Sequence, residues 1–240
     1  MKSRARSHLF LPARTLAAPL PNWEYHAHST WSDGRSPLKE MCKAARLKGV
    51  KRLIFTEHTE PELVQYRDWF VEYREEVHTM REQFPGMEIL AGLEAPVVDF
   101  AGNIGLDAVQ EREAEFILGA VHTYPGTSVP HSEMPPEEAI RIEFEASLAL
   151  LSNPRVDAIA HPGGICHLYI TPFPMTLFRR IVQEAVLQGV AVELNPAYQD
   201  PIEPWLEICR EENALISPGS NAHSLAAVGL AWRKLTQALA

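Results

Sequence analysis

The chain has 240 residues, enough for one large α/β domain or two small ones with a sizeable hydrophobic core. Its formal net charge of −9 makes nucleic acid an unlikely partner, because a sequence-independent binder needs a basic face to displace counterions. No apolar run approaches membrane-spanning length, so no membrane partner is expected, and three widely spaced cysteines indicate a reducing, cytoplasmic location.

The first 21 residues are basic and carry no acidic side chain. Arg14 interrupts their apolar stretch, which argues against a secretory signal. We therefore predict a flexible basic extension over residues 1–21. The remainder, residues 22–240, shows neither a low-complexity linker nor a shift in composition, and we predict that it forms one domain.

A strand is predicted from Trp23, followed by a turn at Gly34. Successive side chains of a strand point to opposite faces, so His26 and His28 project to the same side. With Asp33 in the turn, they form a set of metal ligands. The alternative is a half-buried strand with two hydrogen-bonded histidines and an ordinary turn aspartate.

Strands and helices then alternate along the chain. The pattern predicts helices over residues 37–48, 62–83, 135–151, 176–188, 201–212 and 224–239, and further strands over residues 50–56, 87–93, 116–121, 156–160, 190–194 and 214–217. This order predicts an α/β fold with a parallel, covered sheet. Seven strand-like runs suit a closed or nearly closed β/α barrel, in which chemistry gathers at the carboxyl ends of the strands.

Imidazoles and carboxylates lie on or just after the ends of these predicted strands. One metal ion takes three or four protein ligands, so eight such side chains are enough for two or three ions. A bridging carboxylate such as Glu94 would hold two ions about 3.5–4 Å apart, as in two-metal hydrolytic centres. The candidate ligands are His26, His28, Asp33, His58, Glu94, His122, His161 and His223.

Six short motifs in fixed order make the pattern specific. They are His26-x-His28 with Ser32-Asp33-Gly34, Thr56-Glu57-His58, Gly92-Leu93-Glu94, Gly119-Ala120-Val121-His122, Ala160-His161-Pro162 and Gly219-Ser220-Asn221-Ala222-His223. They resemble the ordered motifs of the PHP family, the polymerase and histidinol phosphatase family of metal-dependent phosphoesterases. The resemblance implies a distorted seven-stranded (β/α)7 barrel with two or three divalent ions, manganese, iron or zinc, on the eight candidate ligands.

Two positions depart from the family pattern. Asn221 stands where the family usually has aspartate, and its amide oxygen can coordinate a metal but brings no charge and cannot act as a base. We keep Asn221 among the candidate metal ligands, with one site weakened. Glu57 stands where the family commonly has aspartate, and we expect it to orient a ligand or a water.

The implied reaction is hydrolysis of a phosphate monoester of a small metabolite by a metal-bridged hydroxide, as in a histidinol phosphatase. We assign catalytic roles to Glu94, His122 and His223. Candidate substrate contacts lie in loops beyond the strand ends, where each is otherwise an ordinary surface side chain: Arg35, Tyr124, His131 and His167. Glu193 and Asn195 are expected to support the cavity floor.

Two other functions stay open from the sequence. The first is a phosphodiesterase or nuclease of the same family, against which the short chain and its acidic balance count. The second is a metal-binding domain with reduced or lost activity, which only Asn221 favours.

Overall fold

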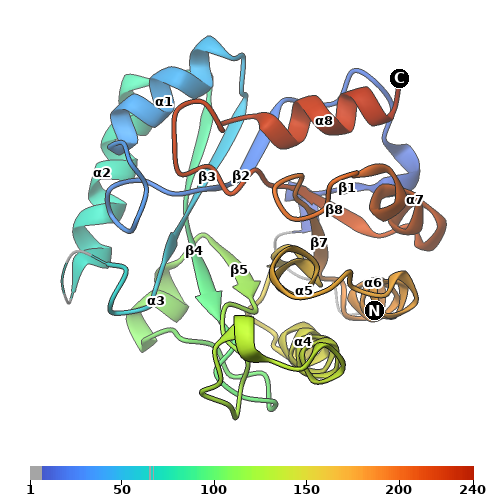
Figure 1. Cartoon of the computed structure of the whole chain (residues 1–240). Helices are drawn as coiled ribbons and strands as arrows, with labels where there is room; N and C mark the ends of the chain where they lie inside the picture. Colours follow the sequence, from blue (N-terminus) through green and yellow to red (C-terminus); the bar gives the residue numbers. More distant parts are fainter. Residues whose placement is uncertain (1–6, 65, 67) are drawn as a thin grey trace. The chain divides into compact units, whose positions relative to one another are not determined.

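The computed structural model describes residues 7–64, 66 and 68–240 (Figure 1). These residues form two compact units, each assembled from separate stretches of the chain. Unit 1 comprises residues 7–16, Pro96–Gly105 and Leu118–Ser217, and unit 2 comprises Ala17–Ala95, Leu106–Ile117 and Pro218–Ala240. The boundary passes inside two strands, β4 and β5, and one domain over residues 22–240 stays a prediction.

Unit 2 contains three parallel strands in the order β2 (Trp23–Ala27), β3 (Arg52–His58) and β4 (Glu88–Pro96), followed by the start of β5 (Phe116–Ala120). His58 lies directly beside Glu94 in the register of β3 and β4. The pairing of β2 with β3 shifts between Glu24 and Ala27, and such an irregularity re-aims the side chains around it.

Helices cover the strands of unit 2 and bury their apolar faces. They are α1 (Leu38–Leu47), α2 (Trp69–Gln83), α3 (Ala108–Glu113) and α8 (Leu230–Ala238). In Figure 1, α1 and α2 lie next to each other. On α2, Phe70, Tyr73, Val77 and Met80 recur at three- and four-residue steps, and all four are buried, as expected of an amphipathic helix.

Unit 1 contains the end of β5, then β6 (Ala158–Ile159), β7 (Ala191–Leu194) and β8 (Leu215–Pro218). The pairs β5–β6 and β6–β7 are parallel. Helix α6 (Met175–Gln188) packs against both α4 (Pro136–Ser152) and α7 (Glu203–Glu212), as Figure 1 also shows. Helix α5 (Gly164–Tyr169) and the 3-10 turn His131–Glu133 complete the unit beyond its first residues.

The amino-terminal residues of unit 1 differ from the predicted flexible extension. Two 3-10 turns, Ser7–Leu9 and Ala13–Thr15, flank a short strand, β1 (Leu11–Pro12), which pairs antiparallel with β8. Leu9, Phe10, Ala13 and Leu16 are buried, so apolar burial holds this stretch in place. Arg14 donates to the carbonyls of Arg210 and Glu211 at the end of α7. Residues 1–6 of the predicted extension lie outside the described residues.

The other differences are short elements and helix ends. The described residues contain eight strands rather than seven because β1 is added. Helix α2 begins at Trp69 rather than near residue 62, and residues 65 and 67 of that stretch lie outside the description. Helices α3 and α5 were not predicted. No helix among the described residues combines the length and the apolar character that a membrane crossing requires.

Candidate metal centre

The strands of unit 2 bring three predicted ligands into contact. This inner group consists of His26, His28 and Glu94, all essentially buried. The Nε2 atoms of His26 and His28 lie 3.1 Å apart. The Glu94 Oε2 atom lies 3.1 Å from His26 Nε2 and 3.5 Å from His28 Nε2.

A second set of ligands surrounds Asp33. This outer group consists of His28, Asp33, His58 and His223. The Asp33 Oδ1 atom lies 3.0 Å from His223 Nε2 and 3.6 Å from His58 Nε2. The ring of His28 lies 4.4 Å from that of His58 and 4.3 Å from that of His223, measured between centroids. His28 therefore belongs to both groups.

The two groups differ in their access to solvent. The side chains of His26 and Glu94 are 0% and 1% exposed, whereas those of Asp33 and His223 are 38% and 29% exposed. A ligand from solvent therefore reaches unit 2 at the outer group. His58 also joins the groups, because its Nδ1 atom lies 3.5 Å from Glu94 Oε2.

The spacing of these atoms fits divalent ions. Four ligand atoms at about 2.0–2.2 Å from a tetrahedral metal ion lie about 3.3–3.6 Å from one another. The measured separations, 3.0–3.6 Å, match that spacing. The buried Nδ1 atom of His28 has no hydrogen-bond partner in the described part of the chain, and imidazole nitrogen is a preferred ligand of zinc and iron. The donor set therefore fits transition-metal ions.

The electrostatic surroundings of His28 and Asp33 favour the states that bind metal. Burial, together with the neighbouring His58 and His26, holds the pKa of His28 well below its usual value and keeps the ring neutral. Burial raises the pKa of Asp33, but the hydrogen bond and charge of His223, the charge of His58 and a backbone hydrogen bond together outweigh it, so the net pKa is lowered. Asp33 thus stays ionised, and although burial opposes it, the contacts of His223 with Asp33 and with the Asn221 carbonyl raise the pKa of His223.

The turn after β2 is fixed by a buried carboxylate, Glu57 on β3. Glu57 accepts the backbone N–H of Ser29 at 2.9 Å, its hydroxyl at 2.6 Å, and the Ser32 hydroxyl at 2.5 Å. A Cβ atom at Gly34 would lie 2.3 Å from the carbonyl oxygen of His28, so only glycine fits this turn. Glu57 therefore holds the turn that carries Asp33, and its predicted role of orienting a ligand or a water stays a prediction.

The last motif joins β2 through its backbone. The N–H of Ala222 donates to the His26 carbonyl at 2.9 Å, and the N–H of His28 donates to the Ala222 carbonyl at 3.1 Å. This single bridge places His223 beside Asp33. Asn221 has a positive φ of 46°, and its backbone carbonyl lies 3.0 Å from His223 Nδ1. The backbone carbonyl of Asn221 thus orients the imidazole of His223, and this contact does not involve the side chain of Asn221.

Unit 1 carries the two remaining predicted histidine ligands. The rings of His122 and His161 lie 6.1 Å apart and nearly parallel. His161 has a φ of 23°, which a non-glycine residue seldom adopts, and such strain is typical of functional positions. Its N–H donates to Glu193 at 2.6 Å, and Asn195 donates to the other oxygen of that carboxylate. The assignment of both histidines as ligands stays a prediction from the resemblance.

The predicted substrate contacts have different surroundings. Arg35 is exposed, and its backbone N–H donates to the His223 carbonyl at 2.9 Å. Tyr124 is buried and its hydroxyl donates to Glu143. His131 packs on the ring of Tyr124, and His167 on that of Trp205. Of the four, Arg35 lies next to the outer group, and all four remain predictions as substrate contacts.

Sequence reasoning missed Glu24. It precedes His26 by two residues on β2, and its side chain is fully buried. Desolvation raises the pKa of Glu24 to about 7 although Ser220, Gly229 and His26 donate hydrogen bonds to it. The signal in the sequence was an acidic residue two positions before His26 and four positions before His28.

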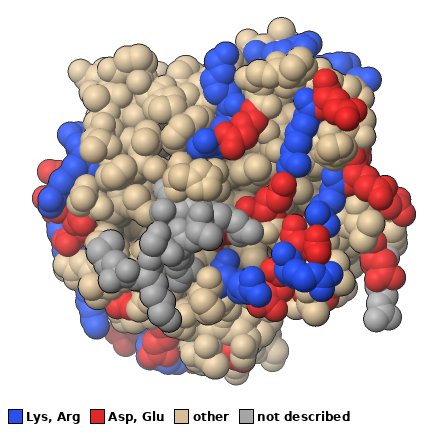
Figure 2. Space-filling model, turned by 180° about the vertical axis from the view of Figure 1, so that it is seen from behind, with Lys and Arg blue, Asp and Glu red and all other residues tan. Residues whose placement is uncertain are grey.

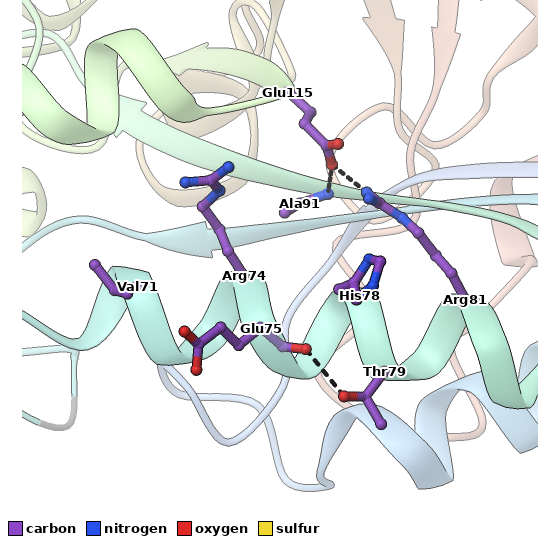
Figure 3. Close-up of a pocket in the computed structure, with 8 residues that line it drawn as sticks. All are labelled: Val71, Arg74, Glu75, His78, Thr79, Arg81, Ala91 and Glu115. Carbon is purple, nitrogen blue, oxygen red and sulfur yellow. Dashed lines mark hydrogen bonds and ion pairs between the residues drawn. The ribbon is translucent and has the colours of Figure 1, made fainter.

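A pocket of about 460 Å³ on unit 2 lies elsewhere, along α2 (Figure 3). Its two arginines are already paired, Arg81 with Glu115 and Arg74 with Glu113. None of its lining residues is a candidate ligand. They are Val71, Arg74, Glu75, His78, Thr79, Arg81, Ala91 and Glu115.

Known proteins resemble this chain over most of its length. The PHP domain family model matches residues 24–216, so the chain belongs to the PHP domain family, as the motifs predicted. The match ends before Asn221 and His223. A probable phosphatase of Acetivibrio thermocellus is 26% identical over 219 residues, covering 85% of this chain and 77% of that protein. The DNA polymerase/3'-5' exonuclease PolX of Bacillus subtilis is 25% identical over 84% of this chain but only 34% of its own length.

The fold is also that of a solved structure. Histidinol phosphate phosphatase from Lactococcus lactis, complexed with zinc, L-histidinol and phosphate, superposes with a TM-score of 0.70 at 20% identity, covering 91% of this chain and 92% of that one. This confirms the predicted α/β barrel class of fold. The predicted enzyme class, a metal-dependent phosphoesterase, agrees with the family and with these relatives.

Proposed function

We propose that this protein hydrolyses the phosphate monoester of a small metabolite with the help of two or three divalent ions, zinc, manganese or iron. The single observation that carries the proposal is the contact of six predicted ligands within unit 2. These are His26, His28, Asp33, His58, Glu94 and His223. The phosphatase relative and the zinc, histidinol and phosphate bound by the Lactococcus enzyme support the same chemistry.

The inner and outer groups would have different roles because they differ in solvent exposure. The buried inner group would hold one ion, and the outer group would hold a second where solvent reaches Asp33 and His223. When bound, such ions supply a nucleophile near neutral pH and neutralise the charge on phosphoryl oxygens. Arg35, exposed beside the outer group, would contact the incoming phosphate as a fixed cation.

The protein's own groups also explain how an acidic chain can take an anionic substrate. The two ligand groups contain only two carboxylates, Asp33 and Glu94, so two bound divalent ions leave them with net positive charge. His122, with Glu94 and His223, is retained as a catalytic candidate on the resemblance, and Glu193 and Asn195 as its supports in unit 1.

The test is a panel of phosphorylated metabolites, with an aryl phosphate as general substrate, after measurement of the metal content of the purified protein. We expect bound transition metal and hydrolysis of monoesters, histidinol phosphate among them. A protein that binds no metal and hydrolyses none of the panel, with manganese, zinc or iron added, would refute the proposal.

A second candidate, phosphodiester hydrolysis, rests on the PolX relative. Against it, acidic and basic side chains are interspersed on the face drawn in Figure 2, and the described residues visible there form no basic platform for a nucleic acid. Comparing a bis-aryl phosphodiester with the aryl monoester separates the two candidates, since a nuclease would prefer the diester.

The third candidate, a domain with reduced or lost activity, depends on Asn221. The Asn221→Asp variant addresses it directly, because aspartate restores a charged oxygen at an unchanged length. A large gain in monoester hydrolysis would show a weakened enzyme, equal activity would show that Asn221 is tolerated, and no activity in either protein would favour the non-enzymatic reading.

A further inference from the structure

The segment that carries His223 is held from two sides, by a buried carboxyl group and by an ammonium group. We call residues 220–229 the His223 segment. Glu24 is fully buried beneath it and accepts hydrogen bonds from both of its ends. The N–H of Ser220 lies 2.9 Å from Glu24 Oε1, and the N–H of Gly229 lies 2.7 Å from Oε2, which also accepts the Ser220 hydroxyl.

Lys48, the residue that ends α1, holds the middle of the same segment. Its ammonium donates to three backbone carbonyls, those of Leu225 at 2.7 Å, Ala226 at 2.8 Å and Val228 at 3.0 Å. The carboxyl group of Glu24 thus accepts hydrogen bonds from backbone N–H groups of the segment, and the ammonium group of Lys48 donates hydrogen bonds to its carbonyls. Each side chain satisfies backbone groups that no regular element pairs.

The His223 segment has little regular structure of its own. It lies between β8 and α8, and Asn221 and Gly229 both have positive φ values, 46° and 75°. Among the described residues, its backbone pairs with a strand at one place, the bridge between Ala222 and β2. The position of the His223 ring, 3.0 Å from Asp33, therefore depends on that bridge, on the Arg35 N–H that donates to the His223 carbonyl, and on what holds the rest of the segment.

Glu24 also connects the His223 segment with strand β2. Its Oε1 atom accepts the N–H of His26 at 3.2 Å, and the Ser220 hydroxyl that it binds accepts in turn the N–H of Ala231 in α8. One carboxylate therefore connects β2, which carries His26 and His28, with the start of the segment that carries His223.

We propose that Glu24 is a positioning residue of the metal centre, with Lys48 as its counterpart, and that the two set the place of His223 in the outer group. Neither side chain is among the candidate metal ligands, so both act through the backbone. The inference rests on the proposed function, because it assumes that the outer group binds an ion. A purely structural role would lower the stability of unit 2 and leave ion affinity unchanged.

The experiment compares ion binding with stability. Wild-type protein, Glu24→Gln, Lys48→Met and Ile89→Ala are freed of metal and titrated with Zn²⁺ and with Co²⁺, whose visible spectrum reports ligand geometry. Ile89→Ala is the matched control, because Ile89 is buried at the other end of β4 from Glu94 and its truncation lowers stability without touching the segment. Thermal melting is recorded for each metal-free protein.

We expect Glu24→Gln to bind one of the ions about 10–100-fold more weakly, the range seen when a supporting group of a metal site is lost. The Co²⁺ spectrum should change in the same variant, and Lys48→Met should shift affinity in the same direction by less. Ile89→Ala should melt earlier and keep wild-type affinity and spectrum.

The inference is overturned if Glu24→Gln binds every ion as the wild type does, or if Ile89→Ala weakens binding equally. Should Glu24→Gln not fold, Ser220→Ala removes one contact of the carboxylate and decides the question by the same readouts. Failure of the proposed function is read separately from the wild-type protein: either it binds no ion, or it binds ions and hydrolyses none of the phosphate esters, and in the second case the comparison of ion affinities still decides the part of Glu24.

Discussion

His28 is the residue on which both ligand groups depend. It lies 3.5 Å from the carboxylate of Glu94 in the inner group, and its ring stacks on those of His58 and His223 in the outer group. His28 is fully buried and its pKa is lowered, so the ring stays neutral and does not gain a proton in place of a missing ion. Removal of this one side chain should therefore affect more than one site.

We predict that His28→Ala loses bound metal from both groups, whereas Glu94→Gln loses it mainly from the inner group. Activity should fall by more than the roughly 10–100-fold that loss of a supporting contact costs, because a direct ligand is removed. Elemental analysis of dialysed protein measures the metal, and circular dichroism checks that the barrel is folded. Full metal occupancy in either variant would contradict the ligand assignment.

At the scale of elements, the turn between β2 and α1 is the most constrained part of unit 2. Glu57 accepts three hydrogen bonds from this turn, and Trp31 in the same turn donates its indole N–H to Glu76 on α2 at 2.7 Å. The turn is therefore fixed to β3 on one side and to α2 on the other, and Asp33 is presented in one place.

We predict that Glu57→Ala destabilises the protein by about 1–3 kcal/mol, because the buried N–H of Ser29 loses its acceptor. It should also weaken metal binding, since the turn that presents Asp33 is released. Urea unfolding of the metal-free protein gives the first quantity and Zn²⁺ titration the second. Glu88→Ala, an exposed change at the other end of the sheet, serves as the comparison and should alter neither by much.

How far the sequence predicts these elements depends on the kind of signal. The strands that deliver His58, Glu94 and His122 were predictable because apolar runs of regular length end in polar ligands. Helix α3 was missed although Asp107 and Gln110 form a capping box at its start, a signal readable in the sequence.

Other features had no readable signal. Strand β1 has two residues and no alternation, so only its pairing with β8 defines it. The candidate site likewise combines residues that the sequence indicates with residues that it does not. The candidate ligands follow from the order of the motifs. The contacts of Lys48 are with three carbonyls about 180 residues away, which no local sequence pattern encodes.

At the scale of the whole molecule, buried carboxylates link stability to pH. Glu143 on α4 is buried and accepts hydrogen bonds from Tyr124 and from the N–H groups of Ile165 and Cys166. Desolvation, only partly offset by these donors, raises its pKa to about 7. The folded protein therefore holds a proton that the unfolded chain releases near pH 4.5.

The sign of the effect follows from proton binding. Between about pH 4.5 and 7 the folded state binds more protons than the unfolded state at Glu143, so its contribution to stability falls as pH rises. We predict that wild-type protein loses more stability than Glu143→Gln between pH 5 and 7.5, by about 2 kcal/mol. Urea midpoints of the metal-free proteins at both pH values measure it. Parallel pH profiles for the two proteins would show that Glu143 does not titrate in this range.

The strand β1 has a practical consequence for anyone trimming the protein to its family-matched region. Its backbone pairs with β8 through Leu11 and Pro12, and the apolar side chains around it are buried. A version that starts at residue 22 would expose β8 as an open sheet edge together with a bare apolar surface, a combination that favours self-association. Strand β1 and the buried residues beside it therefore protect the protein from aggregation. We expect light scattering to detect aggregates of the shortened protein.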